Sequence, residues 1–435
     1  MRTTRSSSLG STDAATGGAH TEVAGTVPPA PRGALPPAFR RLLASATAAN
    51  LGDGLLLVGL PLVVIQLTRE PLLVAAINAW FSLPWLLFAL QAGALADRRS
   101  RRALLVHGAA WRGAFLVVAG AAALLGSLPL AAIYVLVFLL GTAEVLFDTT
   151  SQSLVPDLVD REHLGRANGW LLGLQTVMNN FVGAPLAGLL VGLFGAAMVL
   201  GPAVLYLAAA LVLLSLPGPY RPPARPPARM RTDIAEGLRE LWQHPTLRAL
   251  GLLGAVLNLA NAGYFAVLVL FIVGPSSPMG LTEVGYGLLA ALLAAGSVVG
   301  SLLAGRLEEA IGPRRAALGG VALTSAAMLV PVVTTSVVAV TLMAVVLGFA
   351  SVLVNVVIVS SRQRIVPRAL LGRVNASFRV LVMGASPLGA ALGGAIASAT
   401  TLRTTFVAAV VLQALALVAF HRPVTDAALR GDGSA

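Results

Sequence analysis

The stretch GALADRRSRR, residues 93–102, lies between two apolar segments, residues 73–95 and 104–126. Each segment is long enough to cross a bilayer as a helix, which takes about 20 residues. Because an apolar segment in lipid must satisfy its own backbone hydrogen bonds, each is predicted to be α-helical. The stretch itself, with one aspartate and four arginines, is then a short polar turn between two membrane spans.

The composition makes the membrane the solvent for most of the chain. Of the 435 residues, 57% are hydrophobic and 11% are charged, whereas soluble domains carry roughly 25% charged residues. The chain has no cysteine, which excludes disulfides, a thiolate nucleophile and a cysteine-based metal site. It has no lysine either, which excludes a Walker A nucleotide-binding loop. We therefore expect a protein that is not an enzyme and has no cofactor and no metal site.

Apolar runs of this length recur from Leu42 almost to the C-terminus. Twelve candidate spans cover residues 42–66, 73–95, 104–126, 129–150, 167–192, 196–215, 249–273, 284–307, 315–334, 336–358, 374–397 and 403–421. The predicted fold class is therefore an all-α membrane protein with twelve transmembrane helices.

The arginines set the expected orientation. All 30 basic residues are arginine, and 26 of them lie in the two tails or in the loops that follow even-numbered spans. The opposite loops hold only Arg69 and Arg403, while Arg112 and Arg379 lie in or near spans. Since arginine-rich loops stay on the cytoplasmic side, both termini are predicted to be cytoplasmic. The same distribution accounts for the net charge of +12, so we expect this charge to face lipid and no nucleic acid.

Composition also divides the chain. Residues 1–38 are rich in Ser, Thr, Gly, Ala and Pro and are predicted to be a disordered cytoplasmic tail. A cytoplasmic linker is expected over residues 217–247, with an amphipathic helix from about Asp233 to Gln243, capped by Thr232, on the inner membrane surface. Six-helix bundles are expected over residues 39–216 and 248–421, followed by a cytoplasmic tail over 422–435.

The two halves of the chain resemble each other at nearly one offset. At an offset of 208 positions, the first set of matches is Arg40, Leu42, Asn50 and Leu51 with Arg248, Leu250, Asn258 and Leu259. The second set at this offset is Leu95, Ala96 and Arg98 with Leu303, Ala304 and Arg306. At 207, LGRAN from Leu164 recurs as LGRVN from Leu371. Chance matching in a Leu/Ala/Gly-rich sequence is the alternative. A duplication predicts two parallel six-helix repeats with a substrate site at their interface.

The stretch from Gly93 resembles the Gly-x-Leu-Ala-Asp-Arg signature of the major facilitator superfamily of transporters. The signature stands between spans two and three, and the resemblance covers about residues 40–421. It agrees with the span count and with the duplication. It implies the major facilitator fold and transport by alternating access.

Further motifs resemble one branch of that superfamily. GAPLAG from Gly183 is similar to the antiporter motif of exporters, in a degenerate form. NLGDGLLLVGLPLVV from Asn50, EVLFDTTSQSLVPDLV from Glu144 and RVLVMGASPLGA from Arg379 resemble transmembrane secretion effectors, which include siderophore exporters and multidrug efflux proteins. Many drug exporters carry an arginine on span four, whereas none stands between Leu130 and Asp160. This departure puts a proton relay through such an arginine in doubt.

Ionisable side chains inside spans are the first functional candidates, because each costs about 2.5–3.5 kcal/mol at the bilayer centre on insertion scales. Asp53 lies near the expected midplane of span one, and its repeat mate is Asn261. Glu144 and Asp148 are four residues apart on one face of span four, where each disfavours the charge of the other. Asp53, Glu144 and Asp148 are the predicted proton-coupling residues. The alternatives are a structural carboxyl for Asp53 and a solvated position for Asp148.

The resemblance implies a substrate cavity lined by spans one, four, seven and ten. The polar residues of these spans that are predicted to bind substrate are Asn50, Asp53, Glu144, Asn258, Asn261, Tyr264 and Asn355. A few polar groups among many aliphatic ones suit a bulky, partly apolar solute. For each asparagine, a hydrogen bond between helices is the alternative.

The signature loop implies a gate. The predicted gating residues are Gly93, Asp97, Arg98, Arg101, Arg102 and Asp157. Asp97 would approach the N-terminal end of span eleven near Gly372, and Arg101 or Arg102 would pair with Asp157. Plain positive-inside topology is the alternative for the arginines. Close packing and kinking of helices are predicted for Gly183, Pro185, Gly188 and Pro387.

Together these features predict a proton-coupled exporter, an antiporter of a small amphipathic compound such as a drug, an antibiotic or a siderophore-like metabolite. A nutrient importer and a non-transporting membrane sensor remain alternatives. We expect a monomer in the cell membrane whose partners are its small-molecule substrate, protons and the lipid bilayer.

Overall fold

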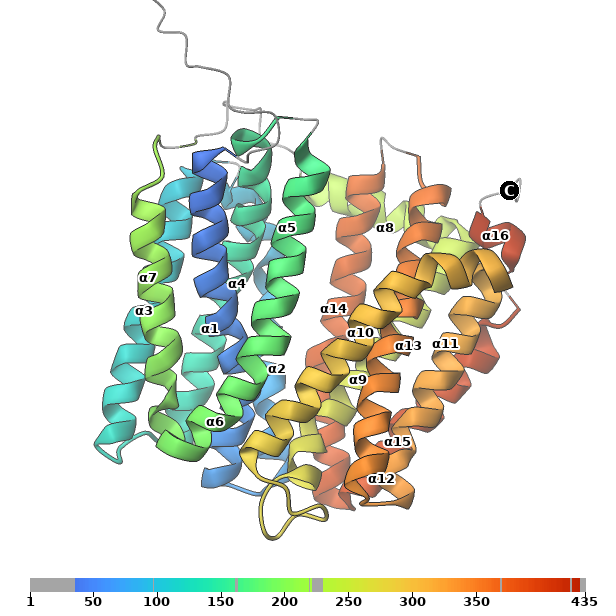
Figure 1. Ribbon diagram of the computed structural model, residues 1–435. Helices are drawn as coiled ribbons and strands as arrows, with labels where there is room; N and C mark the ends of the chain where they lie inside the picture. Colours follow the sequence, from blue (N-terminus) through green and yellow to red (C-terminus); the bar gives the residue numbers. More distant parts are fainter. Residues whose placement is uncertain are drawn as a thin grey trace, which may run out of the picture.

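The computed structural model describes residues 36–96, 98–160, 163–218, 220, 230–367, 370–422 and 425–430. These residues are nearly all helical, and the long helices stand side by side (Figure 1). The elements are α1 Pro37–Leu67, α2 Pro71–Ala96, α3 Arg101–Leu124, α4 Leu130–Leu158, α5 Leu164–Thr176, η2 Val177–Gly183, α6 Ala184–Phe194, η3 Gly195–Val199, α7 Leu200–Leu214, α8 Met230–Gln243, α9 Pro245–Ile272, α10 Glu283–Ile311, α11 Pro313–Met328, α12 Val330–Val333, α13 Val337–Ile365, α14 Leu371–Ala399, α15 Leu402–Phe420 and α16 Asp426–Arg430.

Twelve spans result from these helices. Eleven stretches of described helix are long and apolar enough to cross a membrane, and one of them, Leu164–Leu214, holds two spans. The chain reverses within that stretch at Gly195, whose φ of +54° is in the left-handed region that favours glycine. The predicted all-α fold with twelve spans is confirmed.

The helices form two bundles. We call α1–α7 the N-bundle and α9–α15 the C-bundle (Figure 1). A Cβ added to Gly141 would clash with the Phe81 carbonyl oxygen, and a Cβ added to Gly348 would clash with that of Leu293. The same close crossing of two helices therefore occurs in both bundles, as a duplication predicts.

This crossing also fixes the register of the repeat. Positions 141 and 348 differ by 207, whereas positions 81 and 293 differ by 212. Helix α2 therefore corresponds to α10 at an offset of 212, and the sequence match of Leu95 with Leu303 at 208 is wrong by one helical turn. The extra residues lie in the longer loop before α10, Val273–Thr282.

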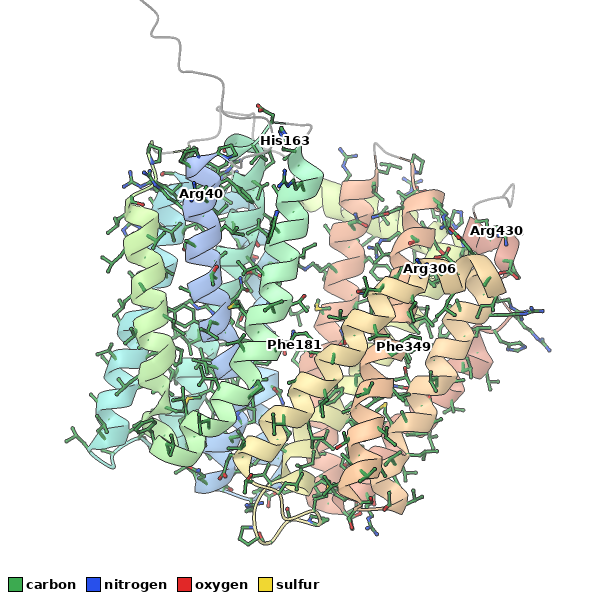
Figure 2. All side chains as sticks on the ribbon, viewed as in Figure 1. Arg40, His163, Phe181, Arg306, Phe349 and Arg430 are labelled. Carbon is green, nitrogen blue, oxygen red and sulfur yellow. The ribbon has the colours of Figure 1, made fainter. Side chains whose placement is uncertain are left out.

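The most extensive contacts between the bundles are those of α2 with α14 and of α6 with α10, and α2 also contacts α9. We call the end of the molecule near Arg40, Arg306 and Arg430 the arginine-rich end (upper in Figure 2) and the other end the arginine-poor end. At the arginine-poor end, Arg69 Nη1 donates to the Val273 carbonyl at 2.7 Å, and the Leu72 N–H donates to Ser398 Oγ at 3.0 Å. Hydrogen bonds thus join the bundles at this end.

The linker helix differs from the prediction. Helix α8 begins at Met230, so Thr232 lies within it and not at its N-cap. Gly237 packs against the backbone of Arg373 on α14, and Leu241 is fully buried. The helix therefore docks on the C-bundle through one face, and Trp242 is half exposed beside it.

The predicted tails also differ. The predicted tail over residues 1–38 lies mostly outside the described residues, and α1 begins at Pro37, just inside its boundary. Within the predicted C-terminal tail, α16 is docked: Asp426 Oδ1 accepts the Arg314 N–H at 3.0 Å, and Leu429 is fully buried. This short helix covers the start of α11.

Gly188 offers a test of the contact between α6 and α10. A Cβ added there would clash with the backbone of Glu283 and Val284, whereas one added to Gly192, a turn later, would meet nothing within 4 Å. Gly188→Ala is expected to destabilise this packing by about 1–3 kcal/mol because backbone cannot give way. Thermal unfolding of the purified protein should show a lower midpoint for Gly188→Ala than for Gly192→Ala. Equal midpoints would contradict the assigned contact.

Candidate functional site

Asp53 lies inside the N-bundle in a cluster of three partnered side chains. Arg112 Nη2 donates to Asp53 Oδ1, and the Tyr206 hydroxyl donates to the same oxygen at 2.6 Å. The Arg112 guanidinium also lies 4.1 Å from the centre of the Tyr206 ring. The Arg112 side chain is 1% exposed and that of Asp53 is 12% exposed, so the ion pair is formed away from water.

Two further carboxyls lie near this pair. Glu144 and Asp148, on one face of α4, are both within electrostatic reach of Arg112. Oε2 of Glu144 is buried and accepts no hydrogen bond from the described residues. We call Asp53, Arg112, Glu144, Asp148 and Tyr206 the charged cluster. It brings all three predicted proton-coupling residues within electrostatic reach of Arg112, and Asp148 is also within reach of Arg379.

The sequence did not assign a role to Arg112 or Tyr206. Arg112 was recognised only as an arginine in or near a span, although a buried cation in lipid needs an anionic partner. Asp53, the deepest carboxyl of span one, was the signal for such a partner. The two residues are 59 positions apart, so only the packing of α1 and α3 against α7 shows that they meet.

A cavity of about 310 Å³ lies within the C-bundle. Three of the predicted substrate-binding residues, Asn258, Asn261 and Asn355, line it. Gln413 Nε2 donates to Asn261 Oδ1 at 2.9 Å at its buried base. The exposed Asn355 lies on α13 at its mouth. We call this space the C-bundle cavity.

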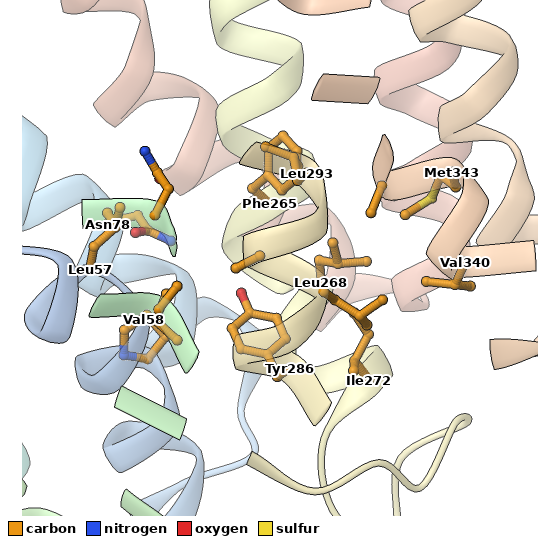
Figure 3. A pocket seen from close by; sticks show the side chains of 16 residues that line it. Leu57, Val58, Asn78, Phe265, Leu268, Ile272, Tyr286, Leu293, Val340 and Met343 are labelled. Atoms are coloured by element: carbon orange, nitrogen blue, oxygen red, sulfur yellow. The ribbon is translucent and has the colours of Figure 1, made fainter. Parts of the chain in front are cut away.

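A second cavity, of about 270 Å³, lies between the two bundles. Its walls are mostly aliphatic and aromatic, and side chains of the two bundles face each other across it (Figure 3). Polar groups come from Asn78 on α2, Asn180 on the π-helix η2 and Tyr286 on α10. None of these three was predicted, because the expected lining came only from spans one, four, seven and ten. We call this space the interbundle cavity.

Four predicted substrate-binding residues line neither cavity: Asp53 and Glu144, which belong to the charged cluster, and Asn50 and Tyr264. Asn50 Nδ2 donates to the Ala46 carbonyl of its own helix at 2.8 Å. Tyr264 is fully buried, donates to Met343 Sδ at 3.4 Å and packs against Phe406 with ring centres 4.7 Å apart. Its place is the core of the C-bundle.

The predicted gating residues lie at the arginine-rich end. Asp97 lies outside the described residues. Arg101 Nη1 pairs with Asp157 Oδ2 at 2.5 Å, as expected, and Arg102 donates to the Leu214 carbonyl at 2.5 Å. These partners all belong to the N-bundle, so a movement between bundles would not by itself break these links.

The contacts of the other described gate residues, Gly93 and Arg98, lie within the N-bundle. The Arg98 N–H donates to the Leu95 carbonyl at 3.1 Å, in the turn after α2. A Cβ on Gly93 would make only an ordinary contact with Thr149, at 3.9 Å. A gating role for this loop therefore stays a prediction that depends mainly on Asp97.

The predicted packing residues lie at close contacts. A Cβ on Gly183 would come 2.8 Å from Gly54 Cα, and a Cβ on Gly287 would come 3.0 Å from Pro185 Cα. Gly188 packs across the bundles on α10, as described above. Pro387 lies inside α14, one residue after Ser386, whose hydroxyl is 3.4 Å from that of Ser82 on α2.

The described part of the chain holds no group of three or more His, Cys, Asp or Glu side chains that would suit a metal ion. The charged cluster has three carboxyls, but one of them, Asp53, is paired with the guanidinium of Arg112.

A sequence profile described as transmembrane secretion effector matches residues 33–430. The chain belongs to this family of major facilitator transporters. It is 28% identical to the enterobactin exporter EntS of Shigella boydii serotype 4 over 376 residues, which cover 84% of this chain and 86% of that protein. The enterobactin exporter EntS of Citrobacter koseri is 27% identical over 377 residues, with the same coverage.

Solved structures support the same fold. A bacterial homologue of the human lysosomal transporter Spinster, inward-facing and occupied, superposes with a TM-score of 0.70 at 17% identity, covering 88% of this chain and 95% of that one. A bacterial homologue of the iron transporter ferroportin, inward-facing, gives 0.67 at 18% identity, covering 88% and 98%. The protein is thus a multi-pass membrane transporter of the major facilitator fold and not an enzyme.

The stability of substituted proteins tests the ion pair between Asp53 and Arg112 in the N-bundle. Arg112→Met is expected to cost about 3–5 kcal/mol, because it leaves Asp53 buried without its counter-charge. Adding Asp53→Asn should recover part of the loss, since the uncompensated charge is then gone. The exposed Arg403→Met serves as the control for the same substitution. The stabilities of the wild type, Arg112→Met, the double variant and Arg403→Met are measured by thermal unfolding of the purified proteins. A double variant no more stable than Arg112→Met would contradict the pairing.

Proposed function

We propose that this protein is a proton-coupled exporter, an antiporter that moves a small amphipathic compound out of the cell as protons enter. The observation that carries the proposal is the charged cluster, in which Asp53 pairs with Arg112 and two further carboxyls, Glu144 and Asp148, lie within electrostatic reach. The family and the exporters among its relatives support the direction. The two cavities, one apolar and one polar, support an amphipathic substrate.

The charge balance of the cluster supports the coupling. With all three carboxyls ionised, they outnumber the two guanidiniums within electrostatic reach, Arg112 and Arg379, the second of which acts on Asp148. At least one negative charge would then remain uncompensated in a low-dielectric interior. Each unmatched charge is costly there, so the cluster favours taking up protons or a cation. Substrate release to the outside exposes the cluster there, where it takes up protons, and the return of the cluster to the cytoplasmic side lets the protons leave as the next substrate binds. This cycle is the physical link between proton movement and transport.

The arrangement of the bundles supports alternating access. We propose that the arginine-rich end faces the cytoplasm, since arginine-rich segments are retained there. The hydrogen bonds of Arg69 and Leu72 close the arginine-poor end in this conformation. Opening that end would require α2 to part from α14 and α6 from α10. Drugs, antibiotics and siderophore-like metabolites are the compounds to test, and enterobactin is included because the relatives are its exporters.

A transport experiment tests the function. Proteoliposomes with an acidic interior, containing protein in the inside-out orientation, are given enterobactin, chloramphenicol or ethidium outside. At least one compound is expected to accumulate, and collapse of the proton gradient should abolish the accumulation. Asp53→Asn and Glu144→Gln should each lower gradient-driven accumulation by on the order of tenfold or more, because they remove a protonatable group. Equal accumulation with and without the gradient, or none of the three compounds moved, would refute proton-coupled export.

A second variant tests the gate. Asp97→Ala is expected to impair this transport severalfold while the protein remains in the membrane. The reason is that the Asp97 carboxyl is expected to approach the N-terminal end of span eleven, where a negative charge is favoured. Asp160→Ala, an exposed aspartate at the same end, is the matched control. Initial rates in the same proteoliposomes measure the effect. Wild-type rates for Asp97→Ala would remove the gating assignment.

A further inference from the structure

The two bundles place different side chains at equivalent positions around their polar centres. Asp53 on α1 corresponds to Asn261 on α9, because the two helices begin at positions 37 and 245, an offset of 208. Each of these side chains accepts a hydrogen bond from the last helix of its own bundle. The donor is Tyr206 in the N-bundle and Gln413 in the C-bundle, and these two positions differ by 207.

The third helix of each bundle supplies the next pair. A Cβ added to Gly108 of α3 would lie 4.0 Å from the Ala143 carbonyl oxygen, and one added to Gly320 of α11 would lie 3.4 Å from the Ala350 carbonyl oxygen. Helices α3 and α11 therefore correspond at an offset of 212 positions. Four residues further on each helix are Arg112 and Thr324. The Thr324 hydroxyl donates to the Gly320 carbonyl of its own helix, and Thr324 lines the C-bundle cavity.

The fourth helix of each bundle completes the comparison. Helices α4 and α13 begin at positions 130 and 337, so each residue of α4 corresponds to the residue of α13 that lies 207 positions later. Glu144 and Asp148 of the charged cluster therefore correspond to Ser351 and Asn355. Every ionisable member of the cluster thus has an uncharged polar counterpart.

All five counterparts line one space. Asn261, Thr324, Ser351, Asn355 and Gln413 are all part of the wall of the C-bundle cavity. Thr324 and Gln413 are buried at its base, whereas Ser351 and Asn355 are exposed at its mouth. No Asp, Glu, Arg or His is among its lining residues. The polar centre that Arg112 fills in the N-bundle is open in the C-bundle.

We infer that the C-bundle cavity binds an uncharged, hydrogen-bonding group of the substrate, such as a hydroxyl-bearing ring or an amide. The inference rests on the proposed function and names the class of compound that the exporter takes. Amide and hydroxyl side chains offer both donors and acceptors, so they satisfy such a group in a lipid-embedded site. An ionised group would find no counter-charge in the wall, which makes its desolvation unfavourable.

The interbundle cavity takes the apolar part of the same molecule. Asn261 of the C-bundle cavity and Phe265 of the interbundle cavity are four residues apart on α9, which is about one helical turn. Residues at this spacing lie on one face of a helix, so the two cavities adjoin along α9. The substrate is therefore an uncharged polar group attached to an apolar body, with the charged cluster left free for protons.

A binding experiment on the purified full-length protein tests this assignment. The neutral probes are chloramphenicol and p-nitrophenyl-β-D-glucoside, each with a nitrophenyl ring and two or more hydroxyls. The cationic probe is tetraphenylphosphonium, which has no hydrogen-bonding group. Equilibrium dialysis at fixed pH, with no gradient, gives each Kd. The wild-type protein is expected to bind at least one neutral probe, and Ser351→Val and Asn355→Leu should each weaken that binding by about tenfold.

Ser301→Val is the matched control, because Ser301 is exposed on α10, outside both cavities, and its hydroxyl donates to its own helix at 2.8 Å. This control should bind every probe as the wild type does. Asn355→Asp should lower neutral binding and raise tetraphenylphosphonium binding, since it places a carboxyl at the position that corresponds to Asp148 in the N-bundle. Loss of neutral binding in Ser301→Val as well, unchanged binding in both cavity variants, or no neutral binding by the wild type would each overturn the inference.

The outcome is separable from that of the proposed function. Selective loss of neutral binding with no gradient dependence of transport would support the cavity and refute proton coupling. Gradient-driven transport with unchanged neutral binding in Ser351→Val and Asn355→Leu would support the coupling and refute the cavity.

Discussion

The bilayer offers no water to the polar groups of a span, so each of them needs a partner within the protein, and this constraint organises the interior of both bundles. Most hydroxyls meet it locally, as Thr142 and Thr324 do by donating to a carbonyl one turn back in their own helix. A charge cannot be satisfied in this way. Arg112 is held by a carboxylate and by the face of Tyr206, and three different helices are brought together around it.

The same solvent makes helix packing depend on shape. Lipid chains are as apolar as leucine, so helices gain little from hiding apolar surface and associate through close contact instead. Glycines facing carbonyls at Gly141 and Gly348 bring α4 and α13 against their neighbours inside each bundle. Gly188 and Gly287 do the same between the bundles. Contacts between bundles are thus as close as contacts within them, but they involve few helices, which suits two bodies that part and meet again.

The sequence predicted the fold well because apolar runs, arginine-rich loops and repeated motifs are local features of the chain. Each carboxyl of the charged cluster was also found, since a carboxyl inside an apolar run is visible without a structure. The ion pair was not, because Asp53 and Arg112 are far apart in sequence. The interbundle cavity was missed for a similar reason: Asn180 and Tyr286 reach it only because η2 and α10 pack across the bundle interface. The register of α2 on α10 was missed because leucine and alanine match by chance one turn away.

The polar centres of the two bundles differ at all five corresponding positions together, and the cost of an unpaired charge explains why. Asp53 without Arg112 would leave a buried carboxylate unmatched, and Arg112 beside an asparagine would leave a guanidinium unmatched, each at a cost of several kcal/mol. A bundle with one member changed is therefore less stable than either complete set. The C-bundle is neutral at all five positions, and the N-bundle keeps the ion pair together with its neighbouring carboxyls. Separation of charge and neutral polarity between two copies of one fold follows from the cost of an unpaired charge in lipid.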